Sequence, residues 1–235
     1  MFFSRNNLKT FFDSVLTGES RTYDDHNWYT SSGLRSYIKG VNTNRNAALN
    51  KDLSDTTIAD VMKFQKNQRS GISGQLWATG RYQIIPSTLK GLVDNNKINP
   101  NQKYSEAIQD ELGEKLLMGR SNLRKYLKKE VADTKEFREK AALDMAKIWS
   151  SIGVPYDMQG SRKAIKKNQS YYSGGGDTAT VKTETVQAAL QKLRNSDSGG
   201  DDKPKPNNNK QILDGVFIGL FIIGSYIFYK KMTSI

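Results

Sequence analysis

The sequence predicts a mainly α-helical protein that ends in one transmembrane helix. Apolar residues recur at helical spacing through most of residues 1–195, and one long apolar run covers residues 212–229. Between them, residues 196–211 contain no apolar side chain, a composition typical of a flexible polar linker. We therefore expect a helical domain over 1–195, a linker over 196–211, a transmembrane helix over 212–229 and a short tail over 230–235.

The first expected helix carries a clear apolar stripe. Its members follow the spacing i, i+3, i+4, i+7, i+8 that places side chains on one face of a helix: Leu8, Phe11, Phe12, Val15 and Leu16. The helix should end at Thr17-Gly18-Glu19. Arg5, Lys9 and Asp13 interrupt the phenylalanines, so this segment lacks the apolar centre of a signal peptide.

The next segment, from Ser20 to Asn50, has little periodicity and is rich in Ser, Thr, Asn, Asp and Tyr. This composition predicts a long surface loop with room for a short hairpin. Long loops in compact domains are usually functional or disordered, and aromatic residues such as Trp28 argue against simple disorder.

Helical signals then recur to the end of the domain. Thr57 begins a capping box for a helix to about Gln68, Pro86 suits the first turn of another, and a third is expected over about 105–118. Two further stripes predict the last helices, and their members are Phe137, Ala141, Met145, Ile148, Trp149 and Ile152, then Val186, Ala189, Leu190 and Leu193. Together these give about six helices around one core.

The apolar run near the C-terminus is long enough to be a membrane anchor. As a helix, its 18 residues would extend about 27 Å, which is marginal for a bilayer. Tyr226 and Tyr229 suit an interface, and Lys230-Lys231 mark one boundary. We therefore expect a single-pass C-terminal anchor.

The net charge of +12 belongs almost wholly to the domain, because residues 1–195 hold 31 basic and 20 acidic side chains. Two clusters stand out, 124–129 and 162–167. They suit an anionic partner or simply a solvated helix face. No aromatic-rich nucleic-acid motif accompanies them, so we expect no specific nucleic-acid partner.

The chain has no cysteine and only one histidine, His26. This excludes disulfides, thiol nucleophiles, iron–sulfur clusters and multi-histidine metal centres, and we expect neither metal nor cofactor. Any Ser-His-Asp arrangement would have to use His26. Carboxylates are therefore the favoured catalytic groups.

Glu19 stands out among them because it follows the first expected helix. The negative end of the helix dipole would raise the pKa of a carboxyl group there and keep it protonated, as an acid that cleaves a glycosidic bond requires. The alternative is a Glu19 that is simply solvated. Asp24 and Asp25 could supply the second carboxylate of a hydrolase, or could serve only as loop caps.

Three segments in this order resemble the lytic transglycosylases of bacteriophages, within the lysozyme-like superfamily. They are Thr17-Gly18-Glu19-Ser20 with the following Tyr23-Asp24-Asp25-His26-Asn27, then the run from Ala78 to Leu89 with its Gly80-Arg81-Tyr82-Gln83-Ile84 element, and Ser170-Tyr171-Tyr172-Ser173-Gly174. The likeness covers roughly residues 10–194 and implies a goose-type or SLT-like helical domain. The family's Ala-aliphatic-Asn element has no clear counterpart, so that part of the site is unassigned.

The resemblance implies roles for seven residues. Glu19 would protonate the oxygen between N-acetylmuramic acid and N-acetylglucosamine, then activate the muramic 6-hydroxyl to close a 1,6-anhydro ring. Ser20 would orient Glu19, Tyr82 and Gln83 would line the groove, and Asn27 would contact sugar. Either Tyr171 or Tyr172 would lie near the acid, or each would pack in the core.

The expected function is thus a peptidoglycan lytic transglycosylase of a phage virion, anchored in the virion membrane and opening the host cell wall during genome entry. Its expected partners are peptidoglycan strands, the virion or host inner membrane, and virion proteins. Two alternatives stay open, a hydrolysing muramidase and an inactive virion structural protein.

Overall fold

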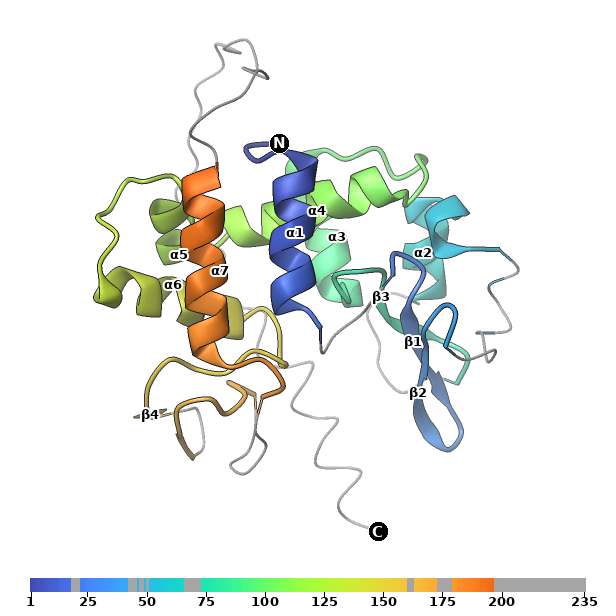
Figure 1. The fold of residues 1–235 in the computed structure, drawn as a ribbon. Coiled ribbons are helices and arrows are strands. Elements are labelled where there is room, and N and C mark those ends of the chain that lie inside the picture. Colours follow the sequence, from blue (N-terminus) through green and yellow to red (C-terminus); the bar gives the residue numbers. More distant parts are fainter. Residues whose placement is uncertain are drawn as a thin grey trace.

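The computed structural model combines helices with two small antiparallel sheets (Figure 1). It describes residues 1–17, 22–41, 46, 49, 51–65, 73–159, 163–172 and 179–196. In chain order its elements are α1 (Arg5–Val15), β1 (His26–Thr30), β2 (Gly33–Tyr37), the short 3₁₀ helix η1 (Leu53–Asp55), α2 (Ile58–Phe64), β3 (Leu76–Thr79), α3 (Pro86–Asn96), α4 (Glu106–Met118), α5 (Ser121–Leu127), α6 (Lys135–Ala146), β4 (Met158–Gln159), β5 (Ala164–Ile165) and α7 (Thr183–Ser196).

The described residues are 46% helical and 15% strand, so the fold is mixed α/β and the prediction of a mainly α-helical chain is wrong. The difference lies mostly in two segments. One is the expected loop between Ser20 and Asn50, which contains β1 and β2, and the other is the stretch before Pro86, which contains β3. Strands of four or five residues leave too short a pattern for periodicity to identify.

The expected membrane anchor also needs correction. Across the described ranges, no helix combines the length and the apolar character needed to cross a bilayer. The run 212–229 lies outside the described residues, as do the tail 230–235 and all of the expected linker except Ser196. A C-terminal transmembrane helix, and the virion-membrane localisation that depended on it, are therefore not supported.

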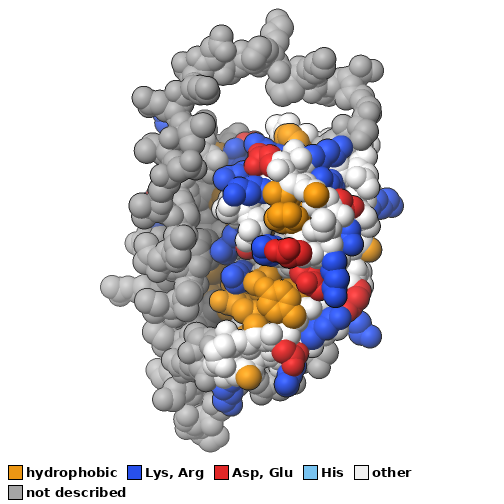
Figure 2. All heavy atoms as spheres, turned by 90° about the vertical axis from the view of Figure 1, so that its left-hand side faces the viewer, with side chains coloured by type: hydrophobic (Ala, Val, Ile, Leu, Met, Phe, Trp, Pro, Cys, Tyr) orange, Lys and Arg blue, Asp and Glu red, His pale blue; other side chains and the backbone are white. Residues whose placement is uncertain are grey.

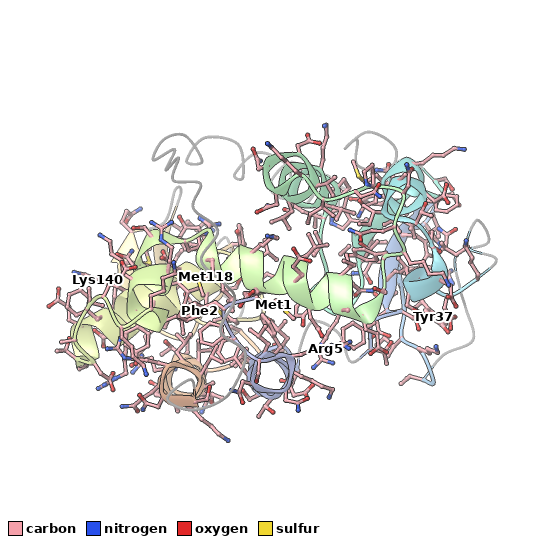
Figure 3. The ribbon with its side chains drawn as sticks, turned by 90° about the horizontal axis from the view of Figure 1, so that it is seen from above. Met1, Phe2, Arg5, Tyr37, Met118 and Lys140 are labelled. Carbon is pink, nitrogen blue, oxygen red and sulfur yellow. The ribbon has the colours of Figure 1, made fainter. Side chains whose placement is uncertain are left out.

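The centre of the molecule is a pair of helices from opposite ends of the described chain. α1 begins at Ser4, whose hydroxyl accepts a hydrogen bond from the Asn7 amide, and its predicted apolar stripe is buried. This stripe packs along α7, and α4 crosses α1. Figure 3 shows α1 and α7 end-on and side by side, with α4 running lengthwise across the view.

The other helices extend the core on either side of this centre. α5 and α6 pack together and against α7, while α3 contacts both α2 and α4. The predicted start signals are confirmed at α2 and α3: the Thr57 hydroxyl accepts from the Asp60 amide, and Pro86 occupies the first turn of α3. α6 ends at Ala146, before the last three residues of the stripe that predicted it.

The larger sheet has the strand order β2-β1-β3, and all its pairs are antiparallel. β1 and β2 form a hairpin in which Thr30 pairs with Gly33, and the register between β1 and β3 shifts between His26 and Trp28. The sheet lies beside α2, away from the α5–α6 pair (Figure 1). Its third strand leads directly into the turn that precedes α3.

Candidate functional site

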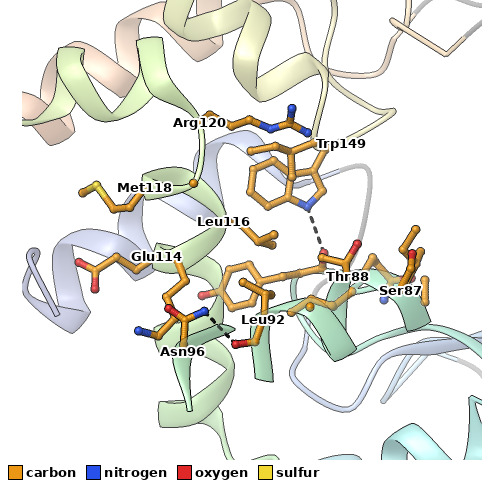
Figure 4. Close-up of a pocket in the computed structure, with 18 of the residues that line it drawn as sticks. Ser87, Thr88, Leu92, Asn96, Glu114, Leu116, Met118, Arg120 and Trp149 are labelled. Carbon is orange, nitrogen blue, oxygen red and sulfur yellow. Dashed lines mark hydrogen bonds between the residues drawn. The ribbon is translucent and has the colours of Figure 1, made fainter. Parts of the chain in front are cut away.

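A groove of about 880 Å³ runs from the sheet to the α4–α5 junction. Its lining is apolar and aromatic over much of its length, with amide and hydroxyl groups near the sheet and cations near α5. Figure 4 shows Trp149, Leu116 and Leu92 around the hollow, with Arg120 beside Trp149. Of the residues expected to bind substrate, the groove contains Asn27, Tyr82, Gln83 and Tyr172.

Gln83 and Asn27 meet at the sheet end of the groove, although they are far apart in the sequence. The Asn27 Nδ2 group donates to Gln83 Oε1 at 2.9 Å, and Gln83 Nε2 donates to the Gly80 carbonyl at 2.8 Å. Within the described residues, the bond to Gln83 is the one hydrogen bond of the Asn27 side-chain amide. Its Oδ1 atom and the second N–H of Nδ2 remain for a ligand. Gln83 Nε2 also lies 3.5 Å from the Asp25 carbonyl oxygen, so within this pair the free donor belongs to Asn27.

The turn that carries Gln83 is held in an unusual backbone conformation. Gly80 has φ 72° and Gln83 has φ 46°, and the turn closes when Thr79 and Ile84 exchange backbone hydrogen bonds of 3.2 and 2.9 Å. A Cβ at Gly80 would lie 2.1 Å from Gln109 Oε1, which accepts a hydrogen bond from the Arg81 amide. Only glycine fits there, because the backbone must approach α4 closely.

Tyr82 forms part of the groove floor, but its hydroxyl points into the core. The hydroxyl donates to Asp110 Oδ1 at 2.6 Å, and the ring packs edge-on against Phe12, with 4.5 Å between the ring centroids. Burial, together with the neighbouring carboxylate, raises the pKa of Tyr82. Trp149 Nε1 donates to the Tyr82 carbonyl at 3.0 Å, which ties the groove wall to this floor (Figure 4). Tyr82 is therefore a neutral, structural part of the groove floor.

The C-terminal end of α1 lies against this floor. Phe12 contacts Tyr82, and Asp13 forms an ion pair with the buried Arg81 guanidinium. α1 ends at Val15 with Leu16 as its C-cap, two residues before the predicted end at Thr17-Gly18-Glu19. The chain is described up to Thr17 and again from Thr22, which is hydrogen-bonded to Asp25. The expected acid Glu19 and its neighbour Ser20 lie outside the described residues.

The two tyrosines expected near the acid lie in different environments. Tyr172 lines the groove, and its hydroxyl donates to the Lys147 carbonyl at 2.6 Å. Tyr171 is partly buried against the hydrophobic core, and its ring meets that of Tyr172 edge-on at 5.4 Å. Tyr172 is therefore the groove residue of the pair, a choice that the sequence left open.

The two aspartates considered for a hydrolase are structural. Asp24 Oδ1 accepts from the Ser54 amide and hydroxyl, both at 2.9 Å, and Oδ2 accepts from Lys39 Nζ at 2.7 Å. Asp25 accepts from the Lys39 amide and from Thr22. Both are buried outside the groove lining, so they serve as the loop anchors that were the alternative interpretation.

His26 has no place in the groove lining. Its ring is buried, packs 4.9 Å from the Tyr37 ring, and places Nδ1 2.8 Å from the Asp24 carbonyl oxygen. Within the described ranges, no cluster of three His, Asp or Glu side chains could hold a metal ion.

Several groove residues were missed by the sequence analysis. Trp77 precedes the predicted motif by one residue, and the amides of Asn95 and Asn96 lie on the last turn of α3. Glu114 is the acidic residue of the described lining, and its Oε1 accepts from the Phe2 and Phe3 amides at 2.5 and 2.8 Å. In the sequence, these four residues are marked only by a position near a motif or within an expected helix, and such a position does not show that a side chain lines a groove.

Comparison with known proteins adds no relative, since no protein-family model, curated protein or solved structure matches the chain.

Proposed function

We propose that this protein cleaves peptidoglycan glycan strands as a lytic transglycosylase, with Glu19 as the catalytic acid and base. One observation carries the proposal: segments far apart in the sequence, which together resemble such an enzyme, meet at one groove. They contribute the Asn27–Gln83 amide pair, Tyr82 beside the end of α1, and Tyr172. Glu19 follows α1 in the sequence.

The chemistry of the groove suits an amide-bearing glycan. N-acetylated sugars present apolar ring faces, hydroxyl groups and amides, and aromatic side chains with a few placed polar groups are the usual way to bind such ligands. Trp77, Trp149 and Tyr172 supply aromatic surface, and Asn27 and Gln83 supply amides. An open groove also admits an internal bond of a polymer.

The proposed reaction needs one acid and no water. Glu19 donates its proton to the glycosidic oxygen as the bond from that oxygen to C1 of the muramic residue breaks, which leaves an oxocarbenium-like centre. The muramic 6-hydroxyl oxygen then bonds to C1 and gives its proton to the Glu19 carboxylate. The products are a 1,6-anhydromuramic end and a free 4-hydroxyl group.

A hydrolysing muramidase is less well supported. It would need a second carboxylate that is free to act at the groove. Asp24 and Asp25 are committed to hydrogen bonds elsewhere, and Glu114, the acidic residue of the described lining, accepts from the Phe2 and Phe3 amides. The role in phage genome entry stays a prediction from the resemblance alone.

The test is the digestion of purified peptidoglycan by the full chain and by Glu19→Gln. We expect lysis by the parent protein, at least a ~100-fold slower rate for the variant because the proton donor is lost, and muramic products lighter by one water than reducing ends. Glu136→Gln, an exposed carboxylate on α6, is the matched control and should lyse normally. Reducing ends would show hydrolysis instead, and equal rates for parent and Glu19→Gln would remove Glu19 from the mechanism.

A further inference from the structure

One end of the groove is lined by four cations, which come from α4, from α5 and from the two cap residues of α5. Arg120, Arg124 and Lys128 lie one helical turn apart, since the amides of Arg124 and Lys128 each bond the carbonyl four residues earlier, at 2.8 and 2.9 Å. Their side chains therefore share one face of α5. Lys115, in the last turn of α4, is the fourth cation of this lining, which we call the cationic end.

The charge of the cationic end is poorly neutralised. Among the described residues, Arg124 and Lys128 form no ion pair, and Lys128 Nζ instead lies 5.8 Å from the centre of the Phe2 ring. Lys115 has only a partly exposed partner, Glu111, at 3.4 Å. The nearby Glu114 carboxylate is buried and accepts from two backbone amides.

The second basic cluster of the sequence behaves differently. Two of its three described basic side chains form ion pairs, with Lys166 Nζ 2.9 Å from Asp157 and Lys167 Nζ 2.5 Å from Glu184. The two clusters look alike in sequence, yet only the one on α5 opens into the groove. Arg124 and Lys128, which form no ion pair among the described residues, lie at one end of the groove, and such cations indicate an anionic part of the ligand.

We infer that the cationic end binds the free carboxylates of the peptide stems that branch from the glycan strand. This inference rests on the proposed function, because the rest of the groove is assigned there to the uncharged sugars. Only the muramic residues, every second sugar, bear a peptide stem, so stem carboxylates occur at separate points along the strand, which matches cations gathered at one end of the groove. A nucleic-acid backbone would instead need cations along its whole track, and the described lining near Leu34, Trp77 and Ile85 contains none.

The test measures equilibrium binding of three soluble, matched glycan fragments to the full chain carrying Glu19→Gln. The fragments bear intact peptide stems, stems whose carboxyl groups are amidated, or no stems. We expect the intact fragment to bind about tenfold more tightly than the other two, which corresponds to about 1.4 kcal/mol. The double variant Arg124→Gln, Lys128→Gln should bind all three alike.

A matched control removes the same charge elsewhere. Lys103→Gln with Lys135→Gln changes two exposed lysines outside the groove, and the tenfold preference should persist. The inference would be overturned if the Glu19→Gln chain bound the intact and amidated fragments equally tightly. It would also be overturned if the control variant lost the tenfold preference as fully as the Arg124→Gln, Lys128→Gln variant. Displacement of the intact fragment by a single-stranded oligonucleotide at lower concentration would assign the cationic end to nucleic acid. If the intact fragment is preferred but the unmodified chain does not cleave peptidoglycan, the proposed function is rejected and the carboxylate-binding site remains.

Discussion

Gln83 is the residue at which backbone strain and groove chemistry coincide. Its φ of 46° is unfavourable for a residue with a Cβ, yet this conformation allows its amide to bridge Asn27 and the Gly80 carbonyl. Such strain persists only where surrounding contacts enforce it, and it concentrates at functional positions. The sequence motif identified Gln83 as a groove residue but held no information on its backbone angle.

Replacing Gln83 by glycine should separate function from stability. The variant loses two hydrogen bonds that contribute about 0.5–1.5 kcal/mol each but relieves a strain of about 1–2 kcal/mol, so its unfolding free energy should stay within about 2 kcal/mol of the parent. Peptidoglycan lysis should fall at least ~10-fold. Lys97→Gly, at an exposed αL position with φ 52° after α3, is the control and should keep full lysis. Chemical denaturation and lysis rates measure both effects, and full lysis by the Gln83 variant would show that its amide does not act on substrate.

At the scale of elements, amphipathic helices were predictable, and the segment Ser20–Asn50 was expected to have room for the short hairpin that β1 and β2 form, but the third strand of the sheet was not predicted. The stripe from Leu8 to Leu16 identified α1 because a helix with one buried face repeats its pattern over several turns. α5 has only seven residues, and the sequence marked it merely as a basic cluster. β3 could not be foreseen, since its pairing with β1 is set by a partner distant in the sequence. The groove could not be predicted for the same reason, because its walls come from segments that are distant in the sequence and meet only in the tertiary fold.

Two helical glycines offer a matched test of how α4 supports the groove floor. A Cβ at Gly113 of α4 would lie 2.9 Å from Tyr82 ring atoms, whereas at Gly91 of α3 the nearest atom is 3.9 Å away. Gly113→Ala should therefore destabilise by about 1–3 kcal/mol through overpacking and should slow lysis by displacing Tyr82. Gly91→Ala should stabilise by about 0.5–1 kcal/mol through helix propensity. Urea unfolding distinguishes them, and equal effects would mean that Tyr82 can shift freely.

Across the whole molecule, the described surface mixes both signs of charge, whereas the described groove lining holds four cations and one acidic residue, Glu114. Figure 2, viewed from the side of α5 and α6, shows Lys and Arg side chains interspersed with acidic ones over the described surface. Many are paired, as in the ion pairs of Lys140 with Glu136 and of Lys135 with Glu139. The net charge of +12 thus indicates a basic molecule overall, but it could not reveal that four cations gather at one end of the groove.

Asp133 connects three helices, so it should govern the acid stability of the helical side of the molecule. It follows α5, accepts hydrogen bonds from Tyr126 of α5 at 2.7 Å and from Gln191 of α7 at 2.6 Å, and pairs with Arg138 of α6 at 2.7 Å. Although burial alone would raise the pKa of Asp133, these hydrogen bonds outweigh it and lower the pKa to about 2. An aspartate in the unfolded chain has a pKa of about 3.9, so this carboxylate contributes its full stabilisation above about pH 4 and loses it as the pH falls toward 2.

Asp133→Asn should therefore lower the unfolding free energy at pH 7 by about 1–2 kcal/mol, since three donors lose a charged acceptor. Its deficit relative to the parent should shrink by at least half between pH 4 and pH 2, because the parent loses the same interaction on protonation. Arg138→Gln, which removes one of the three donors, should show a smaller deficit with the same pH trend. Urea unfolding at several pH values measures both variants. A deficit that stays constant down to pH 2 would mean that the effect of Asp133 comes from packing rather than from its charge.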